Sequence, residues 1–168
     1  MPKPIEGTFP VYFSRYIELV KENDVIAALD AQEDMIQHYF EGLKDKADYA
    51  YAPGKWTLKE MLQHIIDTER IFSFRALCFA RQEKQNIPGF EEDDYAANSH
   101  AAGRSWESLC EEIKAVRKST RFLFESFSKE DYDHSGTANG KATTVVAVGF
   151  MTVGHIYHHV NVIKERYL

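Results

Sequence analysis

The sequence predicts an all-α protein, a four-helix bundle with a long connection between its second and third helices. Three observations predict this fold. Apolar residues recur at intervals of three and four along four long segments, which is typical of helices that bury one face. Between these segments there is no convincing pair of strands. The chain has 168 residues, 44% of them hydrophobic, so a single domain over residues 1–168 can bury a core without disulfides or a structural metal.

The first long helix is expected over residues 24–43. Its apolar residues form one stripe, made of Val25, Ala28, Leu29, Met35, Ile36, Tyr39, Phe40 and Leu43. A shorter helical segment over residues 11–20 is expected to precede it, within an N-terminal arm formed by residues 1–23. Pro53 and Gly54 then give a strong turn signal that separates the first helix from the second.

The second helix is expected to begin at a capping box. Thr57 can accept a hydrogen bond from a free amide of the first turn, while Glu60 reaches back to the amide of Thr57. We expect this helix to end near Gln82. The long connection over residues 84–103 follows, and a loop of this length in a compact domain is often functional. Its acidic run, residues 91–94, lacks the ligand spacing of an EF-hand and is interpreted as a solvated or helix-capping surface.

The third helix follows the expected N-cap residue Ser105 and reaches Phe127. A second loop over residues 128–142 separates it from the last helix. That helix is expected to begin at one of the next two threonines and to end near Arg166. The β-branched residues at its start could begin a strand, but the helical pattern continues for about twenty residues, and this length favours a helix.

The balance of charge and the lack of long apolar segments exclude several kinds of partner. The chain has 20 Lys and Arg against 26 Asp and Glu, a net charge of −6, which repels nucleic acids and anionic membranes. No stretch reaches the ~18 apolar residues of a membrane span, and the first residues lack the apolar core of a signal peptide. Cys78 and Cys110 share no CxxC spacing and are interpreted as reduced core thiols. We therefore expect a cytoplasmic protein that binds neither nucleic acid nor membrane.

The last helix carries histidines at a chelating spacing. With about 100° per residue, His155 and His159 lie within about 40° of each other, so both rings can reach one cation. His158 lies about 60° from His155 on the other side, and spacing alone does not choose between the two pairs. A third ligand must come from another helix, and His64 lies at the edge of the apolar stripe of the second helix.

These residue types indicate the kind of site. Three neutral imidazoles without a carboxylate favour Zn²⁺, Ni²⁺ or another borderline divalent ion with an open position. The alternative is structural, because a histidine on an apolar face often only satisfies a hydrogen bond in the core. The motif lacks the glutamate of HExxH, since Ile156, Tyr157 and His158 fill the gap, and this excludes a protease of the zincin type.

One carboxylate falls where the second helix should be apolar. Glu69 lies near the middle of the stripe, where an unpaired charge would be costly. The structural interpretation is a buried ion pair, and the arginines that could form it are Arg75, Arg117 and Arg121. The functional interpretation is a carboxylate that orients a liganding histidine, a role that Asp67 or Glu60 could also take from the side nearer His64.

Two tryptophans stand beside helix starts. Trp56 precedes the second helix and Trp106 opens the third, and each is expected to fix the entry of the chain into its helix by packing. The remaining histidines, His38, His100 and His134, have no partner at ligand spacing and are expected on the surface or in loops.

Two segments resemble a known family. Residues 55–70, KWTLKEMLQHIIDTER, are similar to the second helix of the DinB-like superfamily, and residues 154–159, GHIYHH, resemble its last helix. The resemblance covers about residues 24–167. It implies a four-helix bundle in which one histidine of the second helix and an HxxxH pair of the fourth hold a divalent metal ion. Matched residue by residue, these ligands are His64, His155 and His159.

The resemblance also implies a function. Bacillithiol S-transferases and mycothiol-dependent isomerases share the bundle and the triad, so the chain is expected to be a metal-dependent S-transferase that acts with a low-molecular-weight thiol on small electrophiles. The alternatives are a metal-dependent hydrolase of small substrates and a metal-binding stress protein without turnover. Asp67, Glu69 and Arg70 are the candidate catalytic residues, provided that they face the cleft. Members of the superfamily often form dimers, so a homodimer is expected.

Overall fold

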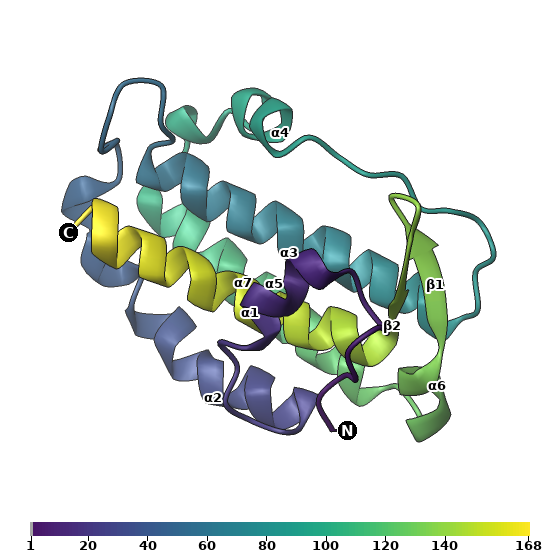
Figure 1. Cartoon of the computed structure of the whole chain (residues 1–168). Helices are drawn as coiled ribbons and strands as arrows, with labels where there is room; N and C mark the ends of the chain where they lie inside the picture. Colours follow the sequence, from purple (N-terminus) through teal and green to yellow (C-terminus); the bar gives the residue numbers. More distant parts are fainter. Residues whose placement is uncertain (1) are drawn as a thin grey trace.

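Four long helices form the body of the molecule (Figure 1). The computed structural model describes residues 2–168, and these helices are α2 (Val25–His38), α3 (Leu58–Ala80), α5 (Trp106–Glu125) and α7 (Val145–Arg166). Helix α3 packs against both α5 and α7, and α2 completes the bundle by contacting the same two helices. The expected fold class, an all-α four-helix bundle, is confirmed. No helix among the described residues is both long and apolar enough to cross a membrane.

Polar side chains begin the long helices as the sequence predicts. Thr57 Oγ1 accepts from the amide of Glu60 at 3.2 Å, and Glu60 Oε2 accepts from the amide of Thr57 at 2.7 Å. Ser105 and Thr144 cap α5 and α7 by accepting from the amide three residues further on. Each bond satisfies a donor that the first helical turn leaves free. Trp106 is buried and donates its indole N–H to a backbone carbonyl oxygen after α2 at 2.9 Å, as expected of a packing residue.

Two segments differ from the expectation. The first long helix was expected to reach residue 43, but α2 ends at His38. A 3₁₀ helix, η2 (Glu41–Lys46), follows it and extends past the end of the expected helix. The long connection after α3 contains α4 (Glu92–Asn98) and another 3₁₀ helix, η3 (Ala101–Gly103). The acidic run supplies the first turn of α4, where negative charge is favourable at the helix N-terminus. The four acidic residues are exposed, which agrees with the solvated surface that the sequence predicts, and the N-cap residue Glu91 makes no side-chain capping bond.

The loop before the last helix is ordered. It contains α6 (Lys129–Asp133) and an antiparallel hairpin of β1 (Ser135–Ala138) and β2 (Lys141–Thr144). The expectation that the chain has no strand pair was therefore wrong. Asn139 and Gly140 connect the strands with φ values of 49° and 69°, and Asn-Gly is a strong signal for a two-residue hairpin turn. The strands are only four residues long, which is too short for a clear alternating pattern.

A layer of buried polar side chains divides the core in two. On each long helix the change from one apolar cluster to the other occurs at a buried polar residue. These four residues, which we call the polar layer, are Gln32 on α2, Glu69 on α3, Arg117 on α5 and His155 on α7. Since His155 belongs to it, the layer lies at the level of the histidines predicted as ligands.

The N-terminal arm crosses the last helix. It contains η1 (Val11–Phe13) and α1 (Ser14–Ile17), and α1 packs on α7 (Figure 1). The approach is close at Gly154, because a Cβ atom there would lie 2.1 Å from the carbonyl oxygen of Tyr16. The ring of Tyr16 is buried and contacts the ring of His155. The glycine therefore lets the arm reach the part of α7 that carries the histidines.

Replacing Gly154 by Ala is expected to displace the arm. The atoms in the way belong to the backbone and cannot move aside as a flexible side chain would, so overpacking of about 1–3 kcal/mol should exceed the gain in helix propensity. Urea unfolding followed by circular dichroism measures the loss. Gly42→Ala is the matched control, since a Cβ atom at Gly42 meets nothing within 4 Å. A change in Gly154→Ala as small as that in Gly42→Ala would contradict the close approach.

Candidate metal centre

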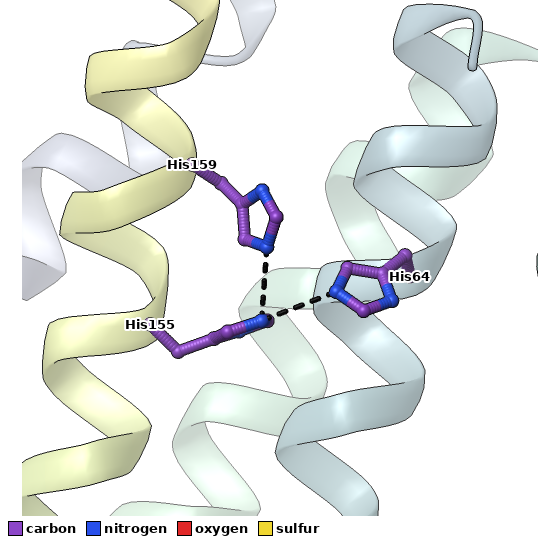
Figure 2. Close-up of side chains that lie close together, drawn as sticks. All are labelled: His64, His155 and His159. Atoms are coloured by element: carbon purple, nitrogen blue, oxygen red, sulfur yellow. Dashed lines mark hydrogen bonds between the residues drawn. The ribbon is translucent and has the colours of Figure 1, made fainter. Parts of the chain in front are cut away.

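Three histidines from two helices meet inside the bundle (Figure 2). His64 comes from α3, and His155 and His159 come from successive turns of α7. His64 Nε2 lies 3.1 Å from His155 Nε2, and His159 Nε2 lies 2.9 Å from the same atom. The ligand atoms of all three residues lie within 4.8 Å of one another. We call these three residues the histidine cluster.

Hydrogen bonding alone does not account for this arrangement. A ring nitrogen carries either one N–H or one lone pair, so His155 Nε2 can make one good hydrogen bond and not two. Three lone pairs directed to one point suit a cation instead. Around a tetrahedral zinc ion, with Zn–N distances of about 2.0–2.1 Å, nitrogen atoms lie about 3.3 Å apart. The two distances to His155 Nε2 are close to this value and all three ligand atoms lie within 4.8 Å of one another, so the residues present fit a divalent ion.

Burial keeps the cluster neutral. The exposed fractions of His64, His155 and His159 are 5%, 4% and 8%. Burial lowers the pKa of His64 to about 4, although the charge of Asp93 acts in the opposite direction. Burial, and then the neighbouring imidazoles, hold the pKa of His155 and of His159 well below the usual value. At neutral pH the three rings are therefore uncharged, which is the state that binds metal ions.

His158 is not part of the cluster. Its half-buried ring packs against the ring of Tyr16, with 5.1 Å between the centroids. The spacing along the last helix left two pairs open, His155 with His158 or His155 with His159. The structure brings the second pair together with His64.

Aromatic rings surround the cluster. The ring centroid of Trp56 lies 4.8 Å from that of His64, and the rings of Tyr16 and Phe72 lie 5.5 and 6.0 Å from that of His155. The sequence indicated only a packing role for Trp56 at the helix entry. It gave no signal for Tyr16, because the arm is distant in sequence from both histidine-bearing helices. Together these rings limit the access of water to the imidazoles.

A cavity of about 320 Å³ lies beside the cluster. His155 forms part of its wall, and six aromatic side chains also line it, namely Tyr12, Phe13, Tyr16, Phe72, Phe79 and Phe90. Thr68, Arg75 and the hairpin residue Lys141 supply polar groups. A volume of this size lies at the lower end of the range for small-molecule sites. A small molecule in this cavity would contact the histidine cluster.

Glu69 is held in a buried ion pair. Arg117 Nε and Nη2 donate to the two carboxylate oxygens of Glu69 at 2.8 and 2.9 Å, and Arg117 Nη1 donates to Gln32 Oε1 at 2.8 Å. This confirms the ion-pair interpretation and identifies Arg117 among the three candidate arginines. Within residues 2–168, Glu69 is neither hydrogen-bonded to the cluster nor part of the cavity wall.

The other candidate residues named from the sequence are also engaged elsewhere. Asp67 accepts from a glutamine of α3 at 3.0 Å, and Arg70 pairs with Glu112 of α5 at 2.6 Å. Glu60 completes the capping box. None of these residues is hydrogen-bonded to the cluster or lines the cavity in the described part of the chain. A catalytic role for Asp67, Glu69 or Arg70 stays a prediction that this geometry does not favour.

The sequence analysis missed an acid on α4. This helix packs against α3 (Figure 1), and the charge of Asp93 acts on His64 through space. Asp93 also lines a small hollow together with Trp56. The acidic run has no ligand spacing of its own, and its distance from His64 is set by the path of the long connection. Periodicity could not reveal this proximity.

Comparison with known proteins identifies the family. The model of the DinB superfamily matches residues 28–163. Among solved structures, the chain is similar to YfiT from Bacillus subtilis, described as a probable metal-dependent hydrolase with an unusual four-helix bundle topology. The TM-score is 0.67 at 17% identity, and the match covers 97% of this chain and 90% of that one. This likeness supports the fold alone.

No match was found among curated protein sequences. The family model nevertheless spans most of the chain and includes His64, His155 and His159. On the strength of this match, the chain belongs to the DinB superfamily.

Proposed function

We propose that the chain is a divalent-metal-dependent enzyme that acts on small molecules, with His64, His155 and His159 as the metal ligands. The convergence of three buried imidazole nitrogens beside a cavity carries this proposal. Zn²⁺ and Ni²⁺ suit three nitrogen donors, and three protein ligands leave a position open for another molecule. His155 belongs both to the cluster and to the cavity wall, so a substrate in the cavity would lie next to that open position.

The reaction that we propose is the transfer of a low-molecular-weight thiol to a small electrophile. A bound divalent ion lowers the pKa of a thiol or of a water molecule that coordinates it. The thiolate sulfur forms a bond to the electrophilic carbon, and the leaving group departs with the electron pair of the broken bond. The chain contributes the cavity that holds the electrophile, while Trp56, Tyr16 and Phe72 keep water from the cluster. A thiolate needs no continuing general base, and in residues 2–168 no carboxylate is hydrogen-bonded to the cluster.

Hydrolysis of a small ester or amide is the second candidate, and Asp93 favours it. Hydrolysis requires a group that takes a proton from the attacking water. Asp93 lines a small hollow together with Trp56, whose ring centroid lies 4.8 Å from that of His64, so this carboxylate could serve as the base. YfiT, which shares the fold, is described as a probable metal-dependent hydrolase.

An assay of both reactions distinguishes the candidates. Protein loaded with Zn²⁺ or Ni²⁺ is incubated with cysteine or bacillithiol and monochlorobimane, and separately with p-nitrophenyl esters. We expect metal-dependent conjugation of the thiol, which chelation abolishes and which His159→Ala lacks, whereas Asp93→Asn retains it. Ester hydrolysis without conjugation, reduced about 10²–10⁴-fold in Asp93→Asn, would favour the hydrolase. Stoichiometric metal without either reaction would support a metal-binding stress protein instead.

A further inference from the structure

The bundle buries two arginines, and their partners differ. The exposed fractions of Arg117 and Arg75 are 3% and 8%. Arg117 donates hydrogen bonds to Glu69 and Gln32, two other members of the polar layer. Arg75, in contrast, forms no ion pair with any of residues 2–168. Arg75 Nη2 donates to the carbonyl oxygen of Pro88 at 3.2 Å, and Arg75 Nε is buried without a partner. The guanidinium carbon also lies 6.0 Å from the ring centroid of Phe90, but a ring at this distance does not replace a carboxylate, so the buried charge calls for a ligand.

Arg75 lines the cavity that reaches the histidine cluster. In the same wall Thr68 is buried, and its hydroxyl oxygen has no hydrogen-bond partner among the described residues. Both residues follow His64 on α3, and Arg75 begins about 16 Å from His64 along the helix axis. Phe72 lies between His64 and Arg75 in the sequence of α3 and lines the same cavity, and its ring centroid lies 6.0 Å from that of His155. The cavity therefore extends along α3 from the cluster to the guanidinium.

We propose that Arg75 recognises a carboxylate of the substrate, whose apolar body lies along Phe72 and whose reacting group lies at the histidine cluster. This inference deepens the proposed function and rests on it for the position of the reacting group. Arginine presents paired N–H donors that match the two oxygens of a carboxylate. The hydroxyl of Thr68 is available to a polar atom nearer the cluster, and the aromatic wall suits an apolar body.

The charges of the cavity wall favour a single negative charge on the ligand. Arg75 is a buried cation, whereas the side chain of Lys141 is exposed. Glu92 also lines the cavity without pairing with Arg75 in the described structure, and it would repel further negative charge. A carboxylate balances the one buried charge, whereas a phosphate dianion would bring an unbalanced charge into the same site.

Matched probes test the inference on the metal-free protein. The probes are 4-phenylbutyrate and its neutral amide, which share an aromatic ring and a linker and differ in charge. By titration calorimetry we expect the wild type to bind the carboxylate at least about tenfold more tightly than the amide, about 1.4 kcal/mol. Arg75→Gln should lose this preference, and Arg75→Lys should recover part of it. Arg81→Gln is the control, since it removes an exposed arginine after α3 and should keep the preference.

A second variant keeps the test independent of the folding of Arg75→Gln. Glu92→Gln removes the negative charge from the wall and should strengthen binding of the carboxylate severalfold. Equal binding of the two probes by the wild type would overturn the inference. So would a preference that needs bound zinc, because the carboxylate would then lie on the metal.

The outcome is separate from that of the metal proposal. If the protein binds no metal but prefers the carboxylate, the metal centre fails and the anion site of Arg75 stands. If His159→Ala abolishes metal binding while the wild type shows no preference, the metal centre stands and the anion site fails. His159 suits this comparison because it does not line the cavity.

Discussion

His155→Ala is expected to lose its bound metal while the bundle stays folded. His155 Nε2 is the atom that both other imidazoles approach, at 3.1 and 2.9 Å, so its removal leaves two ligands on different helices. Loss of a residue that merely orients a ligand already lowers metal affinity 10–100-fold, so loss of the ligand itself should cost more than about 100-fold. Elemental analysis of protein purified without a His tag should find about one divalent ion per wild-type chain and almost none in the variant.

His158→Ala is the matched control. It removes a histidine from the same face of α7 beside Tyr16, but this residue lies outside the cluster. We expect its metal content to equal that of the wild type. Bound metal should also raise the melting temperature of the wild type and of His158→Ala, and not that of His155→Ala. Equal losses of metal in both variants would contradict the ligand set, and an absence of metal in the wild type after incubation with Zn²⁺ and Ni²⁺ would make the histidines structural.

The shared face of His155 and His159 could be predicted because it depends on the regular geometry of a helix. A helix repeats every 3.6 residues, so the spacing of His155 and His159 fixes their shared face before any tertiary contact is known. The choice between His158 and His159 came from the resemblance, since spacing left both open. Helix starts were predictable for a similar reason, because a cap such as that of Thr57 involves neighbours in sequence.

Contacts between distant segments could not be predicted in this way. The position of Tyr16 on His155 depends on where the arm crosses α7, and the proximity of Asp93 to His64 depends on the path of a long connection. The sequence indicated that Glu69 needs an arginine, but three arginines were compatible with the helical patterns. Only the packing of α3 on α5 selects Arg117. The hairpin was missed because its strands are too short for periodicity to identify.

Glu69→Ala is expected to be the most destabilising single substitution that we consider. It leaves the charge of Arg117 buried without its carboxylate, and breaking a buried pair in this way costs about 3–5 kcal/mol of unfolding free energy. Urea unfolding measures this loss. Asp30→Ala is the matched control, because Asp30 of α2 pairs with Arg121 of α5 at the solvent-exposed surface, with Nε and Oδ1 2.6 Å apart. It should cost less than about 1 kcal/mol.

Gln32, Glu69 and Arg117 are the members of the polar layer that are joined by hydrogen bonds, and we call these three residues the polar network. Removing the whole polar network should have a smaller effect on stability than removing Glu69 alone. The combined substitutions Gln32→Met, Glu69→Leu and Arg117→Met replace every charged or amide group of the network by an apolar side chain of similar size. Because no charge remains unpaired, the triple variant should be as stable as the wild type or more stable by about 1–4 kcal/mol. A triple variant as unstable as Glu69→Ala would show that the ion pair itself contributes the stability.

The same triple variant is nevertheless expected to bind zinc at least about tenfold more weakly than the wild type. Gln32 Nε2 donates to the carbonyl oxygen of Val153 at 2.9 Å, two residues before His155, while Gln32 Oε1 accepts from Arg117. The network thereby links α2, α3, α5 and α7 at one level and sets how far α7 is rotated and shifted against α3. Apolar side chains pack in several registers, whereas a metal site needs its ligands within about 0.5 Å of the required positions. Zinc titration of the folded triple variant tests this, and an unchanged affinity would mean that packing alone positions the histidine cluster.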